Sequence, residues 1–162
     1  MVLLRPTYLI NGDVTDIDLA LLRSDGLKGL SFDLDSTLLA PHSGKLTVEV
    51  AGWLEFARAN FKVAIVSNNK KMQYMEQAKL LLDMPITIGR AAKPRRKAFL
   101  DVLRLFELNA QEVAVVGDRP LTDVLGGQRA GMKTVLVWPL KTQIEPRWVK
   151  MMRKLERCVI RP

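Results

Sequence analysis

The sequence predicts an α/β protein built on an open, mainly parallel sheet with helices on both faces, a three-layer Rossmann-like arrangement. Three observations support this prediction. Short apolar runs rich in β-branched residues recur along the chain, helical patterns separate them, and polar side chains follow several of the runs. Strands that alternate with helices are typical of βαβ units, whose parallel strands are buried on both faces.

Five runs of the sequence are expected to form buried strands. They are short and apolar, and they end in polar or turn-forming residues, which is the pattern of strands covered on both faces. The predicted strands lie at 28–34, 62–66, 85–88, 112–117 and 134–138.

The segments between these strands have helical patterns. Thr47 is expected to cap the helix that runs to about Asn60, because a threonine hydroxyl accepts a hydrogen bond from an amide of the first turn. Pro94 and Pro146 suit the first turns of two other helices, where proline removes no intrahelical hydrogen bond. The predicted helices lie at 16–24, 48–60, 70–83, 94–108, 121–131 and about 146–160.

Composition limits the class of protein. The chain has 162 residues, of which 48% are hydrophobic and 26% charged, as expected for one folded domain over residues 1–162. Cys158 is the only cysteine, which excludes a disulfide scaffold. No apolar run reaches the roughly 20 residues of a membrane-spanning helix. The apolar run in the first ten residues is too short and too quickly interrupted to be expected as a signal peptide, so we expect a cytoplasmic protein.

The net charge of +8 is concentrated in two segments. Residues 90–97 carry five basic and no acidic side chains, and residues 141–162 carry seven Lys or Arg against two Glu. The rest of the chain has 13 basic and 15 acidic groups, so its body is nearly neutral. Two local basic patches favour a partner with phosphate groups or an anionic surface.

Polar side chains lie where the predicted strands end. The first strand runs into Asp33 and Asp35, the second into Ser67 and the fourth into Asp118. Lys93 lies just before the helix that follows the third strand. Ligands of open parallel sheets bind outside the carboxyl ends of the strands. The sequence therefore predicts a site at this edge that contains carboxylates, a hydroxyl and an ammonium group.

These residue types suit phosphoryl transfer. Neighbouring carboxylates repel one another unless a hard cation lies among them, and Mg²⁺ prefers oxygen ligands. One carboxylate can then attack phosphorus while another moves protons. Ser67 can bind a phosphate oxygen and Lys93 can balance its charge. Each residue alone also fits a turn or a helix cap, but their joint placement at strand ends favours a site.

Four segments resemble the motifs of the haloacid dehalogenase superfamily of phosphatases. They are FDLDSTL, IVSNN, AKP and VVGDRPLTD, and the resemblance covers about residues 28–138. It implies that Asp33 is the nucleophile. It also implies that Asp35 is the general acid and base and lends its backbone carbonyl to Mg²⁺, with Asp118 as a further metal carboxylate.

The same resemblance implies roles for residues around these carboxylates. Ser67 and Lys93 would hold the phosphoryl group, and Asp123 would orient Lys93 or a metal-bound water. Neighbouring polar residues are expected to contact the phosphate or the rest of the substrate, namely Thr37, Asn68, Asn69, Arg95 and Arg96.

Longer segments are similar to one branch of the superfamily, the YqeG family. The segments are KGLSFDLDSTL, VAIVSNN, AAKPRRKAF and the run over residues 113–140. Ser36 departs from the pattern, since asparagine is expected there in many relatives. This family is similar to the phosphatidylglycerophosphatase of fungal mitochondria, so the resemblance implies hydrolysis of phosphatidylglycerophosphate to phosphatidylglycerol.

The spacing of the motifs leaves no room for a cap domain. Between Thr37 and Ser67 lie 29 residues, and between Asn69 and Lys93 lie 23. One helix and one strand use most of each interval. An open site suits a phosphate presented on something large, such as a lipid surface, or a small substrate covered by a partner subunit.

The last predicted helix is amphipathic and basic. Its apolar side chains fall within about 60° of Trp148 on a helical wheel, and its Lys and Arg residues fill the opposite side. Such a helix either packs its apolar stripe on its own domain or lies on anionic lipid. The lipid substrate implied by the resemblance favours peripheral contact with the inner face of a membrane.

The sequence therefore predicts a capless, Mg²⁺-dependent phosphatase that acts on a phospholipid headgroup. Two alternatives remain. The substrate could be a soluble sugar phosphate or a phosphoprotein, or the chain could mainly bind RNA or a ribonucleoprotein. Trp148 is the only aromatic residue of the basic tail, which disfavours nucleic acid because stacking platforms are few.

Overall fold

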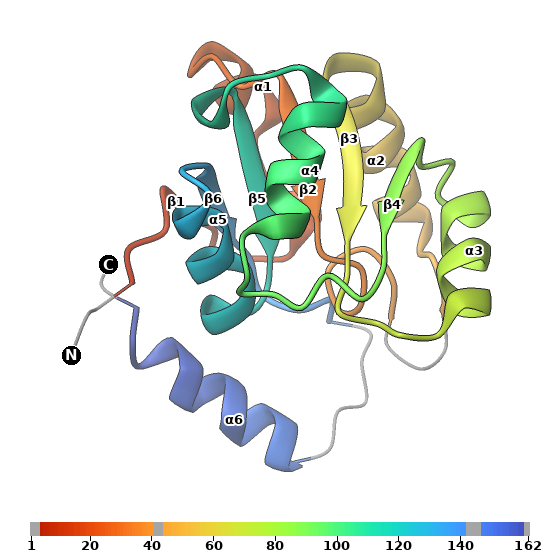
Figure 1. Ribbon diagram of the computed structural model, residues 1–162. Helices are drawn as coiled ribbons and strands as arrows, with labels where there is room; N and C mark the ends of the chain where they lie inside the picture. Colours follow the sequence, from red (N-terminus) through yellow and green to blue (C-terminus); the bar gives the residue numbers. More distant parts are fainter. Residues whose placement is uncertain (1–3, 41–43, 142–146, 161–162) are drawn as a thin grey trace.

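The strands form one parallel sheet (Figure 1). The computed structural model describes residues 4–40, 44–141 and 147–160. The strand order is β1-β6-β5-β2-β3-β4, and every neighbouring pair is parallel. The strands are β1 (Tyr8–Leu9), β2 (Gly29–Phe32), β3 (Lys62–Val66), β4 (Ile86–Ile88), β5 (Val113–Gly117) and β6 (Lys133–Leu136). This architecture confirms the α/β class expected from the sequence.

Helices cover both faces of the sheet (Figure 1). Val63 and Ile65 of β3 pack in one apolar cluster with α1, α2 and α3, whereas Ala64 and Val66 pack in a second cluster with α4. Because alternate side chains of β3 enter different apolar layers, the strand reads as one continuous apolar run. The helices are α1 (Leu19–Ser24), α2 (Val48–Asn60), α3 (Met72–Leu81), α4 (Lys97–Phe106), α5 (Leu125–Arg129) and α6 (Arg147–Arg157).

Most predicted elements are present with shifted ends. β3 lies where it was predicted, and Thr47 caps α2 by accepting a hydrogen bond from Val50 N at 3.3 Å. The first predicted strand is shorter than expected, since β2 ends at Phe32. The next residues form a compact turn in which Leu38 N donates to Leu34 O, and this turn cannot continue the ladder.

Two predicted helices are each divided into a short turn and a helix. The helix expected at 16–24 is a 3-10 turn, η1 (Val14–Asp16), followed by α1, because Asp18 caps α1 and so separates the two. The helix expected at 121–131 is a π-helical turn, η3 (Pro120–Val124), followed by the short α5.

The two prolines expected to open helices have different outcomes. Pro94 lies in a turn and α4 begins only at Lys97, so its predicted place in the first helical turn is wrong. Arg95 N donates to Ala92 O at 3.0 Å in this turn, which leaves the segment unavailable for the helix. Pro146 lies outside the described residues.

The sheet has its switch point between β2 and β5. From β2 the chain continues outward through β3 and β4 on one side and later through β5 and β6 on the other. The carboxyl ends of β2 and β5 therefore lie side by side where the winding reverses, which is the usual ligand position in such sheets.

No cap domain is inserted in the described part of the chain. The connection from β2 to β3 contains α2, and the connection from β3 to β4 contains α3. Helix α6 instead lies beyond the carboxyl ends of the strands (Figure 1). Among the described residues, no helix combines the length and the apolar character needed to cross a membrane.

Candidate active site

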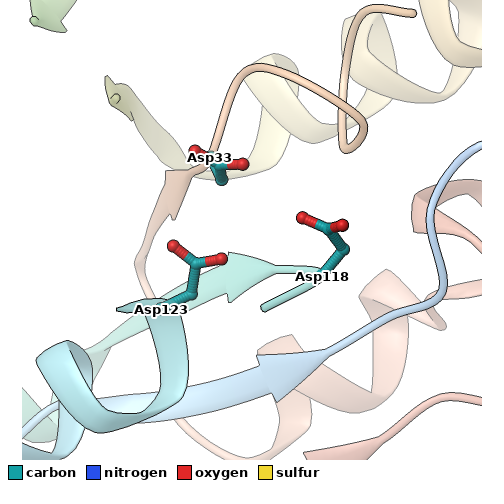
Figure 2. Close-up of side chains that lie close together, drawn as sticks. All are labelled: Asp33, Asp118 and Asp123. Atoms are coloured by element: carbon teal, nitrogen blue, oxygen red, sulfur yellow. The ribbon is translucent and has the colours of Figure 1, made fainter. Parts of the chain in front are cut away.

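Two neighbouring strands position the first carboxylates. Phe32 of β2 pairs with Val116 of β5, so Asp33 and Asp118 leave the sheet next to each other. Asp33 N still donates to Val116 O at 2.8 Å, which fixes the backbone at this point. Figure 2 shows the carboxylates of Asp33, Asp118 and Asp123 directed toward one another. One oxygen of each lies within 4.8 Å of the others.

Lys93 connects two of these carboxylates. Its Nζ donates to Asp33 Oδ1 and to Asp123 Oδ1, each at 2.6 Å. Asn68 fixes the lysine backbone, because its Oδ1 accepts from Lys93 N at 2.7 Å and its Nδ2 donates to Lys93 O at 3.2 Å. Burial alone lowers the pKa of Lys93, but Asp123 and Asp33 outweigh it and raise the pKa above its ordinary value. The ammonium group is therefore charged at neutral pH.

Asp123 is fixed by the turn that carries it. Arg119 N donates to Asp123 Oδ2 at 3.2 Å, and the carboxylate lies against the α-carbon of Gly117, where any β-carbon would overlap it. Burial raises the pKa of Asp123 to about 6, although Lys93 acts in the opposite direction. Gly117 is thus required for the close approach of the Asp123 side chain.

Asp118 is the least satisfied carboxylate of the site. It is 1% exposed, and neither of its side-chain oxygens has a hydrogen bond within the described residues. Arg153 Nη1 lies 3.0 Å from Asp118 Oδ2 as an ion pair. Burial raises the pKa of Asp118 to about 8 despite the opposing effect of Arg153.

The acidic cluster suits a hard divalent cation. Asp123 is engaged by Lys93, whereas Asp118 forms an ion pair with Arg153 but no hydrogen bond within the described residues, and Asp33 faces it. Carboxylate oxygens are the ligands that Mg²⁺ prefers, and a buried carboxylate requires a counter-charge, a place that Arg153 fills beside Asp118 in this structure. Asp33 and Asp118 are the side chains that could hold such a cation.

Asp35 lies on the other side of the same opening. Its Oδ1 accepts from Tyr74 Oη at 2.7 Å, and its Oδ2 accepts from Asn69 Nδ2 at 3.3 Å. Burial and the nearby Asp35 raise the pKa of Tyr74 above its ordinary value, so the phenol remains a donor. Sequence reasoning missed Tyr74, because a tyrosine on an expected helix carries no motif signal.

A cavity of about 190 Å³ contains most of the predicted site residues. Ser67 is 2% exposed, and its Oγ accepts from Asn69 N at 3.1 Å. The predicted residues that line the cavity are Asp33, Asp35, Ser67, Asn68, Asn69 and Lys93. Four lining residues were not predicted, and they are Ser36, Arg119, Thr122 and Arg153.

Three predicted substrate contacts lie outside this lining. Thr37 is 1% exposed, and its hydroxyl has no hydrogen bond within the described residues. Arg95 and Arg96 are exposed and line a separate depression of about 490 Å³ together with Arg129. A larger groove of about 740 Å³ lies at the amino ends of β3 and β4, at the opposite edge of the sheet from the carboxylates.

Helix α6 packs against the site with its charged side. Arg119 and Glu156 form a two-pronged ion pair, with Nη2–Oε1 at 2.5 Å and Nε–Oε2 at 3.3 Å. Arg157 donates to Val137 O, and its guanidinium lies 3.5 Å from the centre of the Trp138 ring. These partners come from segments distant in the sequence, which is why the basic face of α6 was not predicted to contact the site.

Comparison with known proteins agrees with this geometry. Residues 90–143 match the family model described as HAD-hydrolase-like. Over 123 residues the chain is 38% identical to the probable phosphatase YqeG of Bacillus subtilis (strain 168), and the alignment covers 74% of this chain and 69% of that protein. The chain belongs to the YqeG family of haloacid dehalogenase-type phosphatases. The family expected from the sequence motifs is thus confirmed.

This YqeG-family phosphatase has longer relatives in plants and algae. It is 33% identical over 158 residues to phosphatidylglycerophosphate phosphatase 1, chloroplastic/mitochondrial, of Arabidopsis thaliana, covering 92% of this chain and 45% of that protein. It is also 33% identical to phosphatidylglycerophosphate phosphatase 1, chloroplastic, of Chlamydomonas reinhardtii, covering 92% of this chain and 58% of that protein. The chain therefore spans about half the length of these two relatives.

Solved structures share the fold of this phosphatase. An uncharacterized protein from Listeria monocytogenes serotype 4b superimposes with a TM-score of 0.59 at 18% identity, covering 74% of this chain and 85% of that one. A predicted phosphoglycolate phosphatase from Haemophilus somnus gives a TM-score of 0.54 at 16% identity, and the superposition covers 68% of this chain and 85% of that one. At these identities the likeness concerns the fold alone.

Proposed function

We propose that this phosphatase is a Mg²⁺-dependent phosphomonoester hydrolase that works through an aspartyl-phosphate on Asp33. The observation that carries the proposal is the placement of Asp33, which contacts Lys93 on one side and faces Asp118, the ion-pair partner of Arg153, on the other. A carboxylate nucleophile needs both a fixed position and neutralised surroundings. Lys93 supplies one positive charge beside Asp33.

The residues of the cavity divide the reaction between them. Asp33 attacks phosphorus and forms a new P–O bond, while the ester oxygen leaves and takes a proton from Asp35. Asp35 then removes a proton from the water that hydrolyses the aspartyl-phosphate, a double role that suits an acid close to the leaving group. Ser67, Asn69 and Lys93 donate to the phosphate oxygens.

Asp33, Asp118 and the backbone carbonyl of Asp35 are the ligands assigned to Mg²⁺, which would supply Lewis-acid charge stabilisation at the phosphoryl oxygens. Asp123 acts on Lys93, to which it is hydrogen bonded at 2.6 Å. A chelator is expected to abolish turnover, and added Mg²⁺ to restore it. Full turnover in the presence of excess chelator would contradict the metal requirement.

The proposed substrate is phosphatidylglycerophosphate, whose hydrolysis yields phosphatidylglycerol. Two relatives that align with 92% of this chain are named phosphatidylglycerophosphate phosphatases. The site opens to solvent without an inserted cap in the described segments, which suits a phosphate that projects from a lipid surface.

Helix α6 is proposed to bind an anionic membrane peripherally. Its large apolar side chains are exposed, with Trp148 at 66%, Met151 at 58% and Leu155 at 57%. Exposed basic residues flank this stripe, and Arg95 and Arg96 add positive charge elsewhere on the surface. A helix with such faces binds anionic lipid by apolar burial and by electrostatic attraction.

An Asp33→Asn variant tests the mechanism. Asparagine keeps the shape of the side chain but cannot form an acyl-phosphate, so phosphate release should fall to the background rate while the circular dichroism spectrum stays unchanged. The assay measures phosphate released from phosphatidylglycerophosphate in mixed vesicles. Normal release by a folded Asp33→Asn enzyme would rule out the aspartyl-phosphate.

A substrate panel tests the lipid assignment. Phosphatidylglycerophosphate, glycerol 3-phosphate, a sugar phosphate and a phosphopeptide are compared by kcat/KM under the same conditions. The lipid is expected to give the highest value. A soluble ester that exceeds the lipid would replace it as the substrate and leave the proposed chemistry intact.

A further inference from the structure

Helix α6 reverses the usual packing of an amphipathic helix. Such a helix normally buries its apolar stripe and exposes its charges. In α6 the side chain of Arg153 is only 13% exposed and Glu156 is 6% exposed, whereas Trp148 is 66% exposed. Arg153 and Glu156 therefore face the protein, where their ion pairs hold the helix at the edge of the sheet. Three other basic residues of the helix stay exposed, namely Arg147, Lys150 and Lys154.

Arg153 is the α6 residue that reaches the carboxylates. Its Nη1 lies 3.0 Å from Asp118 Oδ2, and its Nη2 donates to Ser36 Oγ at 3.0 Å. It lines the same cavity as Asp33 and Lys93. Burying a guanidinium beside a carboxylate has a large desolvation cost, so attachment of α6 alone is a weak reason for its position.

Glu156 and Arg157 already attach the helix. Glu156 pairs with Arg119 through both of its oxygens, and Arg157 contacts Trp138 and Val137. Arg153 adds a positive charge at the mouth of a site whose substrate is an anion. A planar guanidinium with several N–H donors matches phosphate oxygens better than any other side chain.

We propose that Arg153 is a substrate-binding residue that donates to a phosphate oxygen of the substrate, so that α6 completes the site. The proposal rests on the proposed function. Asp118 is there a ligand of the divalent cation, and a cation bound to Asp118 would compensate that carboxylate in place of Arg153. The guanidinium, still oriented by Ser36, would then have the substrate phosphate as its counter-charge.

The phosphate group that Arg153 contacts can be either of two groups in one substrate. Phosphatidylglycerophosphate carries the phosphomonoester that is hydrolysed and a phosphodiester nearer the lipid. Both offer the same oxygen ligands to Arg153. Soluble substrates that contain one or both groups distinguish them, namely glycerol 3-phosphate and a short-chain phosphatidylglycerophosphate kept below its micelle concentration.

The test uses Arg153→Gln, Arg153→Lys and a matched control, Arg157→Gln. Arg157 also anchors α6 but does not line the cavity. KM and kcat are measured on both soluble substrates, and the Kd of inorganic phosphate is measured by calorimetry with Mg²⁺ present. Hydrogen exchange of α6 reports whether each variant keeps the helix in place.

Arg153→Gln is expected to raise KM by roughly 10-fold to 100-fold, because the variant loses one charge-assisted hydrogen bond to the substrate. Arg153→Lys should recover part of this loss, and Arg157→Gln should stay within about twofold of the native values. A matching rise on both substrates and in the phosphate Kd assigns Arg153 to the hydrolysed group. A rise on the diester-containing substrate alone assigns it to the second phosphate.

The proposal is overturned in two cases. In the first, Arg153→Gln keeps α6 in place and changes neither KM nor the phosphate Kd. In the second, Arg157→Gln causes the same losses, which would make the effect one of helix attachment. Failure of the proposed function is a separate result, because phosphate binding is measured without turnover and Asp33→Asn tests the chemistry independently.

Discussion

Gly117 determines how closely Asp123 can approach the end of β5. A β-carbon at residue 117 would overlap the Asp123 carboxylate. Since Asp123 holds Lys93 at 2.6 Å, a displaced Asp123 would also release the ammonium group from its position beside Asp33. Because Gly117 has no side chain, Asp123 can hold Lys93 in its position beside Asp33.

Gly117→Ala is therefore expected to lower kcat/KM by about tenfold or more, because small misplacements of catalytic groups are costly. It should also lower the free energy of unfolding by about 1–3 kcal/mol, the usual cost of overpacking. Activity assays and urea unfolding check both values. The control is Gly52→Ala in α2, where an added β-carbon meets no atom within 4 Å.

Gly52→Ala should stabilise the protein by about 1 kcal/mol through helix propensity and leave activity unchanged. If the two alanine variants behave alike, the close approach at Gly117 has no functional importance.

The buried carboxylates predict how stability depends on pH without metal. The pKa of Asp118 is raised to about 8 and that of Asp123 to about 6, whereas an unfolded aspartate titrates near about 3.9. Between these values the folded chain binds more protons than the unfolded chain. The free energy of unfolding should therefore fall as pH rises from about 4 to about 8, by up to about 1.4 kcal/mol per pH unit for each proton.

Urea unfolding in chelator over this pH range measures the slope, and Asp118→Asn should flatten it above pH 6, where only Asp118 still differs between the two states. A stability that rises with pH over the same interval would contradict the sign.

At the scale of elements, α6 is the helix whose orientation departs from its sequence pattern. The apolar stripe would ordinarily be assigned to the core, yet Trp148, Met151 and Leu155 are exposed. The partners that decide the orientation are the pairs Arg153–Asp118 and Arg119–Glu156. Local periodicity contains no information about such distant pairs.

The exposed stripe predicts membrane binding that can be removed without loss of chemistry. Trp148→Asn combined with Met151→Asn should weaken binding to vesicles containing phosphatidylglycerol by about tenfold or more, because less apolar surface is buried. Hydrolysis of a soluble ester should not change. Vesicle sedimentation and a soluble-ester assay provide the measurements.

Phe56→Asn is the matched control, since Phe56 is 60% exposed on α2, away from the proposed membrane face. Equal vesicle binding by the native protein, the double variant and Phe56→Asn would refute a membrane role for α6. Added salt should weaken native binding, as expected for basic residues on anionic lipid.

The site residues that the sequence could predict differ in one respect from those that it could not. Asp33, Ser67 and Asp118 each directly follow a strand, and Lys93 lies in the connection from β4 to α4, so the topology of a parallel sheet brings them together. Tyr74 and Arg153 have no such position, and only tertiary packing reveals their contacts with Asp35 and Asp118.

Short or interrupted elements escaped prediction for a related reason. β1 has two residues, too few for any apolar alternation, and its place is decided by pairing with β6. The π-helical turn of η3 places Asp123 toward Lys93, and a sequence pattern with helical spacing does not distinguish it from an ordinary helix.

Over the whole molecule, the open site and the basic helix α6 lie at the same edge of the sheet. The sheet directs Asp33 and Asp118 to its carboxyl edge, and α6 lies beyond that edge (Figure 1). Arg153 of α6 turns toward the site, where it pairs with Asp118. Arg153, which pairs with Asp118, and the exposed apolar side chains therefore occupy different sides of one short helix.

The order of elements along the chain separates the contacts of Lys93 from the residue that α6 contributes. All six strands and the residues that hold Lys93 precede α6 in the sequence. The sheet and the Asp33–Lys93–Asp123 contacts are therefore built entirely from residues that precede Arg153 in the sequence. The helix that carries Arg153 adds one residue to a cavity whose other lining residues all come from the preceding part of the chain.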